Sequence, residues 1–479
     1  MSANDDVLRR LNDERIERVR VAWCDMHGVF RGKTLMPHAV ADALTQGVGM
    51  VSTLVLKDTS DRTAYPVFES GGTAELQGFG FANNFLLMPD AASYRTLPWA
   101  SGTAWMQGQL MLPDGTPLAI DPRRVLALAI ERLHRAGYGL KCGLEVEFHI
   151  YRIDDARMDP ALAAWPGEPP KLSLIHPGFM LLAEGHGDLA DEALRIVQHT
   201  ALGLGLPLRS LEIELGPSQV EAVFDATGAM QAADQMALFR NGVKQALRRA
   251  GYHASFMCRP PFDKVMASGW HLHHSLVQLS SGANAFMRDA ATPGSGEANA
   301  EHTLSDIGQA WLAGLLAHAR GMAAFCSTTV NGYSRFRANT MAPMAALWGR
   351  DNRGAMLRVL GAAGDTATRI ENRLGEPAAN PYLYIAAQIH AGLDGIERGL
   401  RAPPATAAPY ATSSIDPAQA LPTSLGEALD ALAADTTLCA AFGSELVNCW
   451  TRIKRSEQAR FDASADKIEW QRREYFSRY

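Results

Sequence analysis

The sequence predicts an α+β protein with two domains, a small one over residues 1–115 and a large one over residues 116–479. The 479 residues provide enough chain for more than one domain and a large core. Strand-like segments dominate up to about Leu112, where Pro113, Asp114 and Gly115 form a turn. Further on, to about residue 400, helical periodicity alternates with strand-like alternation.

The first domain combines short helices with strands. An amphipathic pattern predicts a helix over residues 5–19, and residues 19–36 read as a hairpin that turns at Met26, His27 and Gly28. We expect a second helix over residues 37–47. Two further strands are predicted over residues 50–56 and 84–88.

The large domain begins with a helix, because Asp121 is suited to the N-cap and Pro122 to the first helical position. Its elements follow from hydrophobic periodicity. The predicted helices span 125–136, 188–203, 229–250, 304–322, 352–360 and 380–400. The predicted strands span 138–151, 209–215, 271–278 and 369–374, and a helical segment ends the chain.

Composition excludes several classes of protein. The formal net charge of -6 and the pI near 6.2 argue against nucleic acid or an anionic membrane as the main partner. No apolar run approaches the roughly 20 residues of a membrane span, and the polar N-terminus predicts no signal peptide. The 6 cysteines are scattered without a CxxC pair, so we expect reduced thiols in a cytoplasmic protein.

Two acidic residues, Glu145 and Glu147, lie two positions apart in the predicted strand 138–151. Side chains at i and i+2 of a strand point to the same face, so both carboxylates would project from one side while Val146 packs on the other. Like charges this close repel, and burying them without compensation is costly. This segment alone leaves two alternatives open, a cation site and a solvated face of an edge strand.

Two further segments carry polar side chains on one strand face. Glu212 and Glu214 share a face, and a Gly-Pro-Ser turn brings the chain back so that Glu214 and Glu221 can approach one point. The segment 268–275 (SGWHLHHS) places His271 and His273 together. A hairpin with surface acids and a structural histidine strand are the alternatives.

A fourth segment, 368–373 (TRIENR), alternates Arg369, Glu371 and Arg373 onto one face. It is either a surface ion-pair ladder or a site that binds a metal through the acid and an anion through the arginines. Together the four segments supply mainly oxygen ligands, which favour Mg²⁺ or Mn²⁺ over zinc. Two such cations beside arginines indicate chemistry on a polyphosphate.

The motifs, in this order, resemble those of the glutamine synthetase family over nearly the whole chain. The segment 143–148 resembles G-x-E-x-E-F, and 214–221 resembles E-x-x-P-G-Q-x-E with Ser218 where glycine is usual. The other matching segments are 268–275 (S-G-x-H-x-H-x-S), 331–335 (N-S-Y-x-R), 351–358, 369–373 and 380–383. The resemblance implies an N-terminal β-grasp domain and a catalytic domain with a curved antiparallel sheet.

The resemblance also implies roles for particular residues. One metal would be held by Glu147, Glu214 and Glu221, and the other by Glu145, His271 and Glu371. ATP would contact His273, Ser275, Arg358 and Arg369. Glutamate would be bound by Arg335 and Arg373, with Glu147 and Met341 bordering the substrates, and Arg353 would stabilise the transferring phosphoryl group.

The chemistry implied by the resemblance is a two-step ligation that consumes ATP. The γ-carboxylate of glutamate attacks the γ-phosphate of ATP, and an amine then intercepts the γ-glutamyl phosphate. The same resemblance implies a ring-shaped, dodecamer-like homo-oligomer. Its active sites would lie between the N-terminal domain of one subunit and the catalytic domain of the next.

Departures from the family pattern concern the amine. Family members that use ammonia carry a glutamate six residues after the arginine of N-S-Y-x-R, and that position is Met341 here. A thioether neither attracts a small cation nor acts as a base. Met266 replaces a polar residue of the family, and we expect it and Trp270 near the acceptor or the glutamate. Asp58 is a candidate for the ammonium-binding aspartate.

The pattern is more similar to the γ-glutamylamide branch, exemplified by γ-glutamylpolyamine synthetase, in which the acceptor is an organic amine. We therefore expect an alkylamine, an aromatic amine such as aniline, or a polyamine. A glutamine synthetase that uses ammonia, a catalytically silent scaffold and a kinase of similar fold are the alternatives. Six metal-ligand matches argue against the scaffold, and Arg335 together with the N-terminal domain favours a ligase over a kinase.

Overall fold

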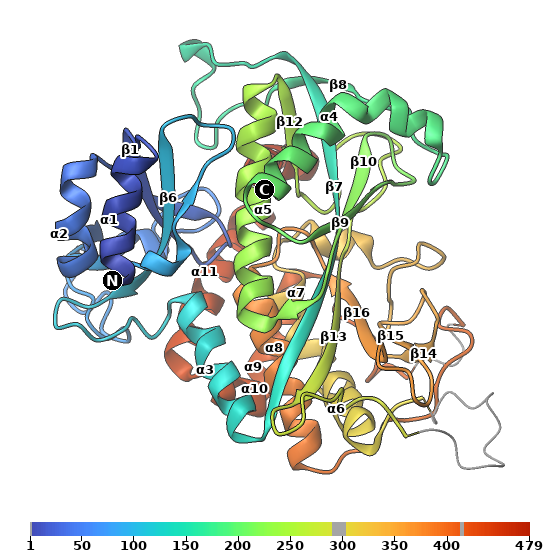
Figure 1. Ribbon diagram of the computed structural model, residues 1–479. Coiled ribbons are helices and arrows are strands. Elements are labelled where there is room, and N and C mark those ends of the chain that lie inside the picture. The colour runs from blue at the N-terminus through green and yellow to red at the C-terminus, as the bar shows by residue number, and fades with distance from the viewer. Residues whose placement is uncertain (1, 290–302, 412–415) are drawn as a thin grey trace.

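The computed structural model describes residues 2–289, 303–411 and 416–479 (Figure 1). Helices and strands mix along the chain around two sheets, which confirms the predicted α+β class. The elements before the turn at residues 113–115 are α1 (Ala3–Asp13), β1 (Arg18–Cys24), β2 (Phe30–Leu35), α2 (Val40–Gln46), β3 (Val48–Val51), β4 (Asn84–Pro89), β5 (Arg95–Thr96) and β6 (Thr103–Met111).

The N-terminal sheet has the strand order β2-β1-β6-β4-β3, with β5 added on β6. Strands β1 and β2 form the predicted antiparallel hairpin, whereas β1 and β6 run parallel. The predicted helix 5–19 is shorter than expected: α1 ends at Asp13, and Arg15 adopts a φ of 53° before β1 begins. The predicted strand 50–56 is mostly a 3-10 turn, Ser52–Leu56, which follows the short strand β3.

The large sheet has the strand order β14-β15-β16-β13-β7-β10-β9, and β8, β11 and β12 also pair with β7. Its strands are β7 (Tyr138–Asp155), β8 (Lys171–Leu174), β9 (Leu208–Ile213), β10 (Gln219–Phe224), β11 (Thr227–Gly228), β12 (Tyr252–Ser255), β13 (Trp270–Gln278), β14 (Trp348–Arg350), β15 (Leu357–Leu360) and β16 (Arg369–Gly375). Strand β7 spans 18 residues and runs through the middle of this sheet (Figure 1).

Helices pack against the large sheet and fill the rest of the molecule. They are α3 (Pro122–Arg135), α4 (Glu184–Gly203), α5 (Ala229–Arg249), α6 (Asp306–Ala317), α7 (Ala319–Cys326), α8 (Pro381–Glu397), α9 (Leu425–Ala434), α10 (Thr436–Phe442), α11 (Ser444–Ala463) and α12 (Lys467–Tyr475). Helix α8 is buried along nearly its whole length and contacts α3, α5, α6 and α7. The last four helices confirm the predicted helical C-terminal segment.

Two predicted helices differ from the structure. The segment 304–322 is divided at His318, whose imidazole lies between Asp394 and Asp435 at 2.9 and 2.7 Å, so α6 and α7 are separate helices. The predicted helix 352–360 is wrong. Residues Leu357–Leu360 form strand β15, because they pair with β16 at the edge of the large sheet.

Buried polar side chains join the two sheets. Arg240 on α5 donates to the carbonyl of Gly28 at 2.6 Å and to that of Pro377 at 2.7 Å. Asn380 donates from Nδ2 to the carbonyl of Asp25 at 2.9 Å. The predicted domain boundary at residue 115 lies between β6 and α3 and stays a prediction. Within the described ranges, no helix has the length and apolarity that a bilayer crossing requires.

Candidate active site

The pairing of four strands brings the predicted acids and histidines to one place. In the register of the large sheet, Glu145 on β7 faces His271 on β13, and Glu147 faces Glu221 on β10. On the other side of β13, His273 faces Glu371 on β16. Directly opposed residues have neighbouring side chains on the same face of a sheet. The side chains that alternation places on one face of each strand therefore meet at the centre of the sheet.

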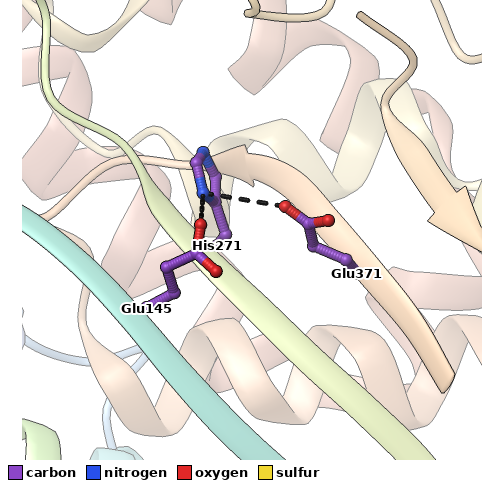
Figure 2. A group of neighbouring side chains, drawn as sticks. All are labelled: Glu145, His271 and Glu371. Carbon is purple, nitrogen blue, oxygen red and sulfur yellow. Dashed lines mark hydrogen bonds and ion pairs between the residues drawn. The ribbon is translucent and has the colours of Figure 1, made fainter. Parts of the chain in front are cut away.

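Glu145, His271 and Glu371 form a first group, with ligand atoms that all lie within 4.8 Å of one another. His271 stands between the two carboxylates, as Figure 2 shows. Its Nδ1 lies 2.8 Å from Glu145 Oε1 and 3.7 Å from Glu371 Oε1. Two carboxylates and an imidazole at this separation are suited to hold a divalent cation.

Glu147, Glu221 and His271 form a second group, whose ligand atoms also lie within 4.8 Å of one another. The Nε2 atom of His271 lies 3.8 Å from Glu147 Oε1, so the two nitrogens of one ring face different groups. The resemblance implied Glu214 as the third ligand here instead. Glu214 lines the same cavity, and its carboxylate accepts from the backbone N–H of Leu215 at 3.1 Å. The ligand assignment of both metals stays a prediction.

The protonation of these acids depends on burial and on their neighbours. Burial, followed by the charge of Glu214, raises the pKa of Glu147 to about 8. Burial and the charges of Glu145 and Glu147 raise the pKa of Glu221 to about 11. Burial and the charge of Arg373 lower the pKa of His271 to about 4, which leaves its imidazole neutral. Ionising these acids together is costly unless a positive charge lies among them.

Glu371 is held ionised by two arginines. Burial alone would raise its pKa, but the charge of Arg373 lowers it. Arg358 donates from Nη1 to Glu371 Oε2 at 2.9 Å and also binds Asp351, and Arg373 forms an ion pair with Glu371 Oε1. This carboxylate, whose side chain has no exposed area, therefore connects the first group to the guanidinium groups beside it.

Arg335 presents a third buried guanidinium, beside those of Arg358 and Arg373. It lies in the 3-10 turn Gly332–Arg335, and its Nη2 donates to the carbonyl of Arg373 at 2.6 Å. Among the described residues, Arg335 forms no ion pair within 4 Å, and the buried Nε of Arg373 has no hydrogen-bond partner. A buried cation and an unsatisfied N–H beside a cavity are suited to bind an anionic substrate.

A cavity of about 660 Å³ connects these groups. Its lining includes every member of the two groups except the fully buried Glu371, and seven arginines, among them Arg335, Arg353 and Arg373. Met266 and Met341 also line it, the Met341 side chain is 59% exposed, and their place near the acceptor or the glutamate stays a prediction. The expectation for Trp270 is wrong. Its side chain is fully buried against Tyr384, because alternation turns it to the opposite face of β13 from His271.

The residues predicted to contact ATP lie around the first group. Arg369 donates from Nε to His273 Nδ1 at 3.2 Å, and His273 Nε2 lies 3.0 Å from Glu145 Oε2. Ser275 lies two positions beyond His273 on β13. Within the described ranges, these three residues do not line the cavity, and their role in ATP binding stays a prediction. Asp58 is buried and forms an ion pair with Arg460 at 2.9 Å.

Sequence patterns missed two kinds of residue at this site. Gln219 donates from Nε2 to Glu147 Oε2 and to Ser268 Oγ, both at 3.0 Å, and so orients a predicted ligand. Its position as the Gln of E-x-x-P-G-Q-x-E was the available signal. Leu181 and Leu182 line the cavity from a loop between β8 and α4, where no periodicity marks a residue.

Comparisons with known proteins agree with this geometry. The family model described as glutamine synthetase, catalytic domain, matches residues 119–473. The γ-glutamylanilide synthase of Acinetobacter sp. is 37% identical and the alignment covers 99% of this chain and 96% of the relative. The γ-glutamylethanolamide synthetase of Streptomyces coelicolor is 31% identical, with 97% of this chain and 93% of the relative covered.

A solved structure is similar over the same extent. The structure of GmaS without ligand superposes with a TM-score of 0.77 at 28% identity, covering 98% of each chain. This similarity confirms the predicted glutamine synthetase-like fold. The extent of the family match and the identity of the relatives agree with the motif resemblance. The chain therefore belongs to the glutamine synthetase family, in the branch whose members are named for γ-glutamylamides.

Proposed function

We propose that this protein is an ATP-dependent ligase that joins the γ-carboxylate of glutamate to an organic amine. One observation supports this above the others: two carboxylate–imidazole groups meet at one cavity that Arg335, Arg353 and Arg373 also line, in a chain whose relatives are named as γ-glutamylamide synthases. The carboxylate groups are suited to cations and the arginines to anions, which is the requirement of phosphoryl transfer from ATP.

The side chains present fit the divalent cations that the family uses. Glu145, His271 and Glu371 would hold one, and Glu147 and Glu221 with Glu214 or His271 would hold the other. The buried acids with raised pKa values, Glu147 and Glu221, support this fit, because a nearby cation would favour their ionised form. Mg²⁺ or Mn²⁺ bound there would offset negative charge on the phosphates of ATP.

The arginines have separate tasks in the proposed reaction. Arg335 and the unsatisfied Nε of Arg373 would bind the carboxylates of glutamate and orient the γ-carboxylate. Arg353 is exposed at the cavity wall and would approach the phosphoryl group as negative charge develops on it. We assign catalytic roles to Arg335 and Arg353 on this basis.

The reaction proceeds through a mixed anhydride. An oxygen of the γ-carboxylate bonds to the γ-phosphorus of ATP as the bond to the β-phosphate oxygen breaks, which yields γ-glutamyl phosphate and ADP. The amine nitrogen then bonds to the γ-carbon, phosphate leaves, and the nitrogen loses a proton. Met341 can neither attract ammonium nor take that proton, so the position does not favour ammonia as the acceptor.

An acceptor panel tests the proposal. ADP release would be measured with glutamate, Mg²⁺ and ATP for ammonium, isopropylamine, ethanolamine, aniline and putrescine, and mass spectrometry would identify the product. We expect an organic amine to give the highest kcat/KM and a γ-glutamylamide. Ammonium as the best acceptor would contradict the proposal, and a phosphorylated product without an amide would indicate a kinase.

We further propose a cytoplasmic, ring-shaped homo-oligomer with a dodecamer-like arrangement and active sites between subunits. All six cysteines, which lie within the described ranges, are free thiols, in agreement with a reducing compartment. Phe68 and Phe81 are 77% and 70% exposed beside the N-terminal sheet, and apolar surface of this kind is typical of subunit contacts. Light scattering would measure the assembly directly.

A further inference from the structure

We propose that Leu181 and Leu182 form a hydrophobic subsite for the substituent of the acceptor, so that the enzyme selects amines with an aryl or alkyl group. This inference rests on the proposed ligase function. It goes further by assigning acceptor selectivity to a loop that no family motif includes. It also commits to apolar amines, and excludes polyamines as preferred acceptors.

The first observation is the uneven chemistry of the cavity wall. Seven arginines, among them Arg335, Arg353 and Arg373, supply positive charge, and the two carboxylate groups supply the cation sites. The remaining lining includes eight apolar side chains: Leu181, Leu182, Leu215, Val223, Val265, Met266, Ala267 and Met341. Glutamate and the phosphates of ATP are anionic, and three of the four residues predicted to contact ATP (His273, Ser275 and Arg369) lie outside this cavity, so neither reactant accounts for its apolar wall. The amine substituent is the remaining part of the reactants.

The second observation is the exposure of the two leucines. The side chains of Leu181 and Leu182 are 49% and 62% exposed, although they line a cavity and do not stand on a convex surface. Covering water-exposed apolar surface with the apolar part of a ligand is favourable and therefore strengthens binding. The protonated ends of a polyamine would gain nothing from these side chains and would instead favour carboxylates or aromatic faces.

The third observation is that the loop is held rigidly beside the reacting groups. The backbone N–H of Phe179 donates to the carbonyl of Leu215 at 2.6 Å, and that of Leu182 donates to the carbonyl of Ile213 at 3.0 Å. These two carbonyls belong to the residues on either side of Glu214, so the loop lies along the backbone that carries this cavity carboxylate. A fixed apolar wall can discriminate between acceptors, because it does not adapt to a smaller one.

Backbone strain accompanies this placement. Phe179 and Leu182 have φ values of 61° and 55°, a region that side chains with a bulky Cγ seldom occupy. Gly178 precedes them with a φ of 73°, and a Cβ atom there would clash with the backbone of Pro217. Such conformations cost free energy and concentrate where a ligand is clamped. Leu182, which has one of these φ values, lines the cavity.

The test replaces Leu182 with asparagine, which has a similar volume and tolerates the left-handed φ better than most residues. Full-length L182N and wild type would be compared by kcat/KM for aniline and for methylamine, at saturating glutamate and ATP. We expect L182N to lose about tenfold or more with aniline and less than about threefold with methylamine. The variant L181A should shift the same ratio in the same direction.

Leu189→Asn is the matched control. Leu189 lies on α4, is 61% exposed and does not line the cavity, so L189N should leave the aniline-to-methylamine ratio unchanged. An unchanged ratio in both L182N and L181A would overturn the inference while leaving the ligase function intact. Equal losses with both amines, together with a smaller assembly by light scattering, would also overturn it, because the leucines would then serve a subunit contact. Absence of any amide product in the wild type would refute the ligase function itself.

Discussion

Replacement of Glu371 with glutamine is the sharpest test of the first cation group. The change keeps the shape of the side chain but removes one negative charge from a fully buried position. The ligand atoms of Glu145, His271 and Glu371 lie within 4.8 Å of one another, so a cation among them would lie about 4 Å or less from the lost charge.

The size of the effect follows from Coulomb's law. Two unit charges about 4 Å apart interact by about 4 kcal/mol at an effective dielectric constant near 20. Mg²⁺ carries two charges, which doubles this figure, while the amide oxygen of glutamine offsets part of the loss, so about 4 kcal/mol is a lower bound. Because about 1.4 kcal/mol corresponds to a factor of ten, E371Q should weaken Mg²⁺ binding about a thousandfold or more. The substitution also leaves the Arg373 and Arg358 charges with less compensation, so the free energy of unfolding without Mg²⁺ should fall by about 3 kcal/mol or more.

Isothermal titration with Mg²⁺ alone, and the rise in Tm that Mg²⁺ produces over each variant's own baseline, would measure the effect. Glu212→Gln is the control, because Glu212 lines the cavity but belongs to neither group and accepts from Ser210 at 2.8 Å. E212Q should bind Mg²⁺ within a few-fold of wild type. If E371Q bound Mg²⁺ as tightly as E212Q, the assignment of Glu371 as a ligand would be refuted.

Two other predictions concern the helical layer. Burial alone would lower the pKa of His318, but its bonds to Asp435 and Asp394 raise it above the usual value. The protonated ring therefore stabilises the fold fully below about pH 6.5, and this contribution is lost as pH rises through the folded-state pKa. H318Q should therefore be less stable than wild type in urea at low pH, with a difference that shrinks toward pH 9; a difference that grows would contradict this. In Gly395→Ala, the new Cβ would clash with a backbone carbonyl of α6. The free energy of unfolding, measured in urea, should therefore fall by about 1–3 kcal/mol. Gly185→Ala is the control, because the space around Gly185 on α4 is open and the free energy of unfolding should not change.

The strands that carry the site could be predicted because their pattern is local. Alternation within one strand predicts that Glu145 and Glu147 share a face, and that His271 and His273 do, without any knowledge of which strands pair. The register that sets His271 opposite Glu145 depends on contacts between segments about 130 residues apart, which no window of sequence contains. The family resemblance supplied that association, and the structure supplied the distances.

Errors occurred where tertiary contacts override local propensity. The segment 352–360 has no marked alternation, and only pairing with β16 makes Leu357–Leu360 a strand. The helix 304–322 is continuous in periodicity, but it is divided at His318, whose ring faces Asp394 on α8 and Asp435 at the start of α10. Leu182 could not be predicted as a cavity residue, because its side chain is directed by a φ that nothing in the neighbouring sequence specifies.

His271 belongs to both carboxylate groups, and this sharing makes them competitors. A neutral imidazole offers one nitrogen lone pair, while its other nitrogen carries hydrogen. With Nδ1 directed at Glu145 and Nε2 at Glu147, the ring can ligate a cation on one side only and must donate a hydrogen bond on the other. The tautomer of a single side chain therefore decides which position gains a nitrogen ligand, and the two cation affinities are thermodynamically linked through it.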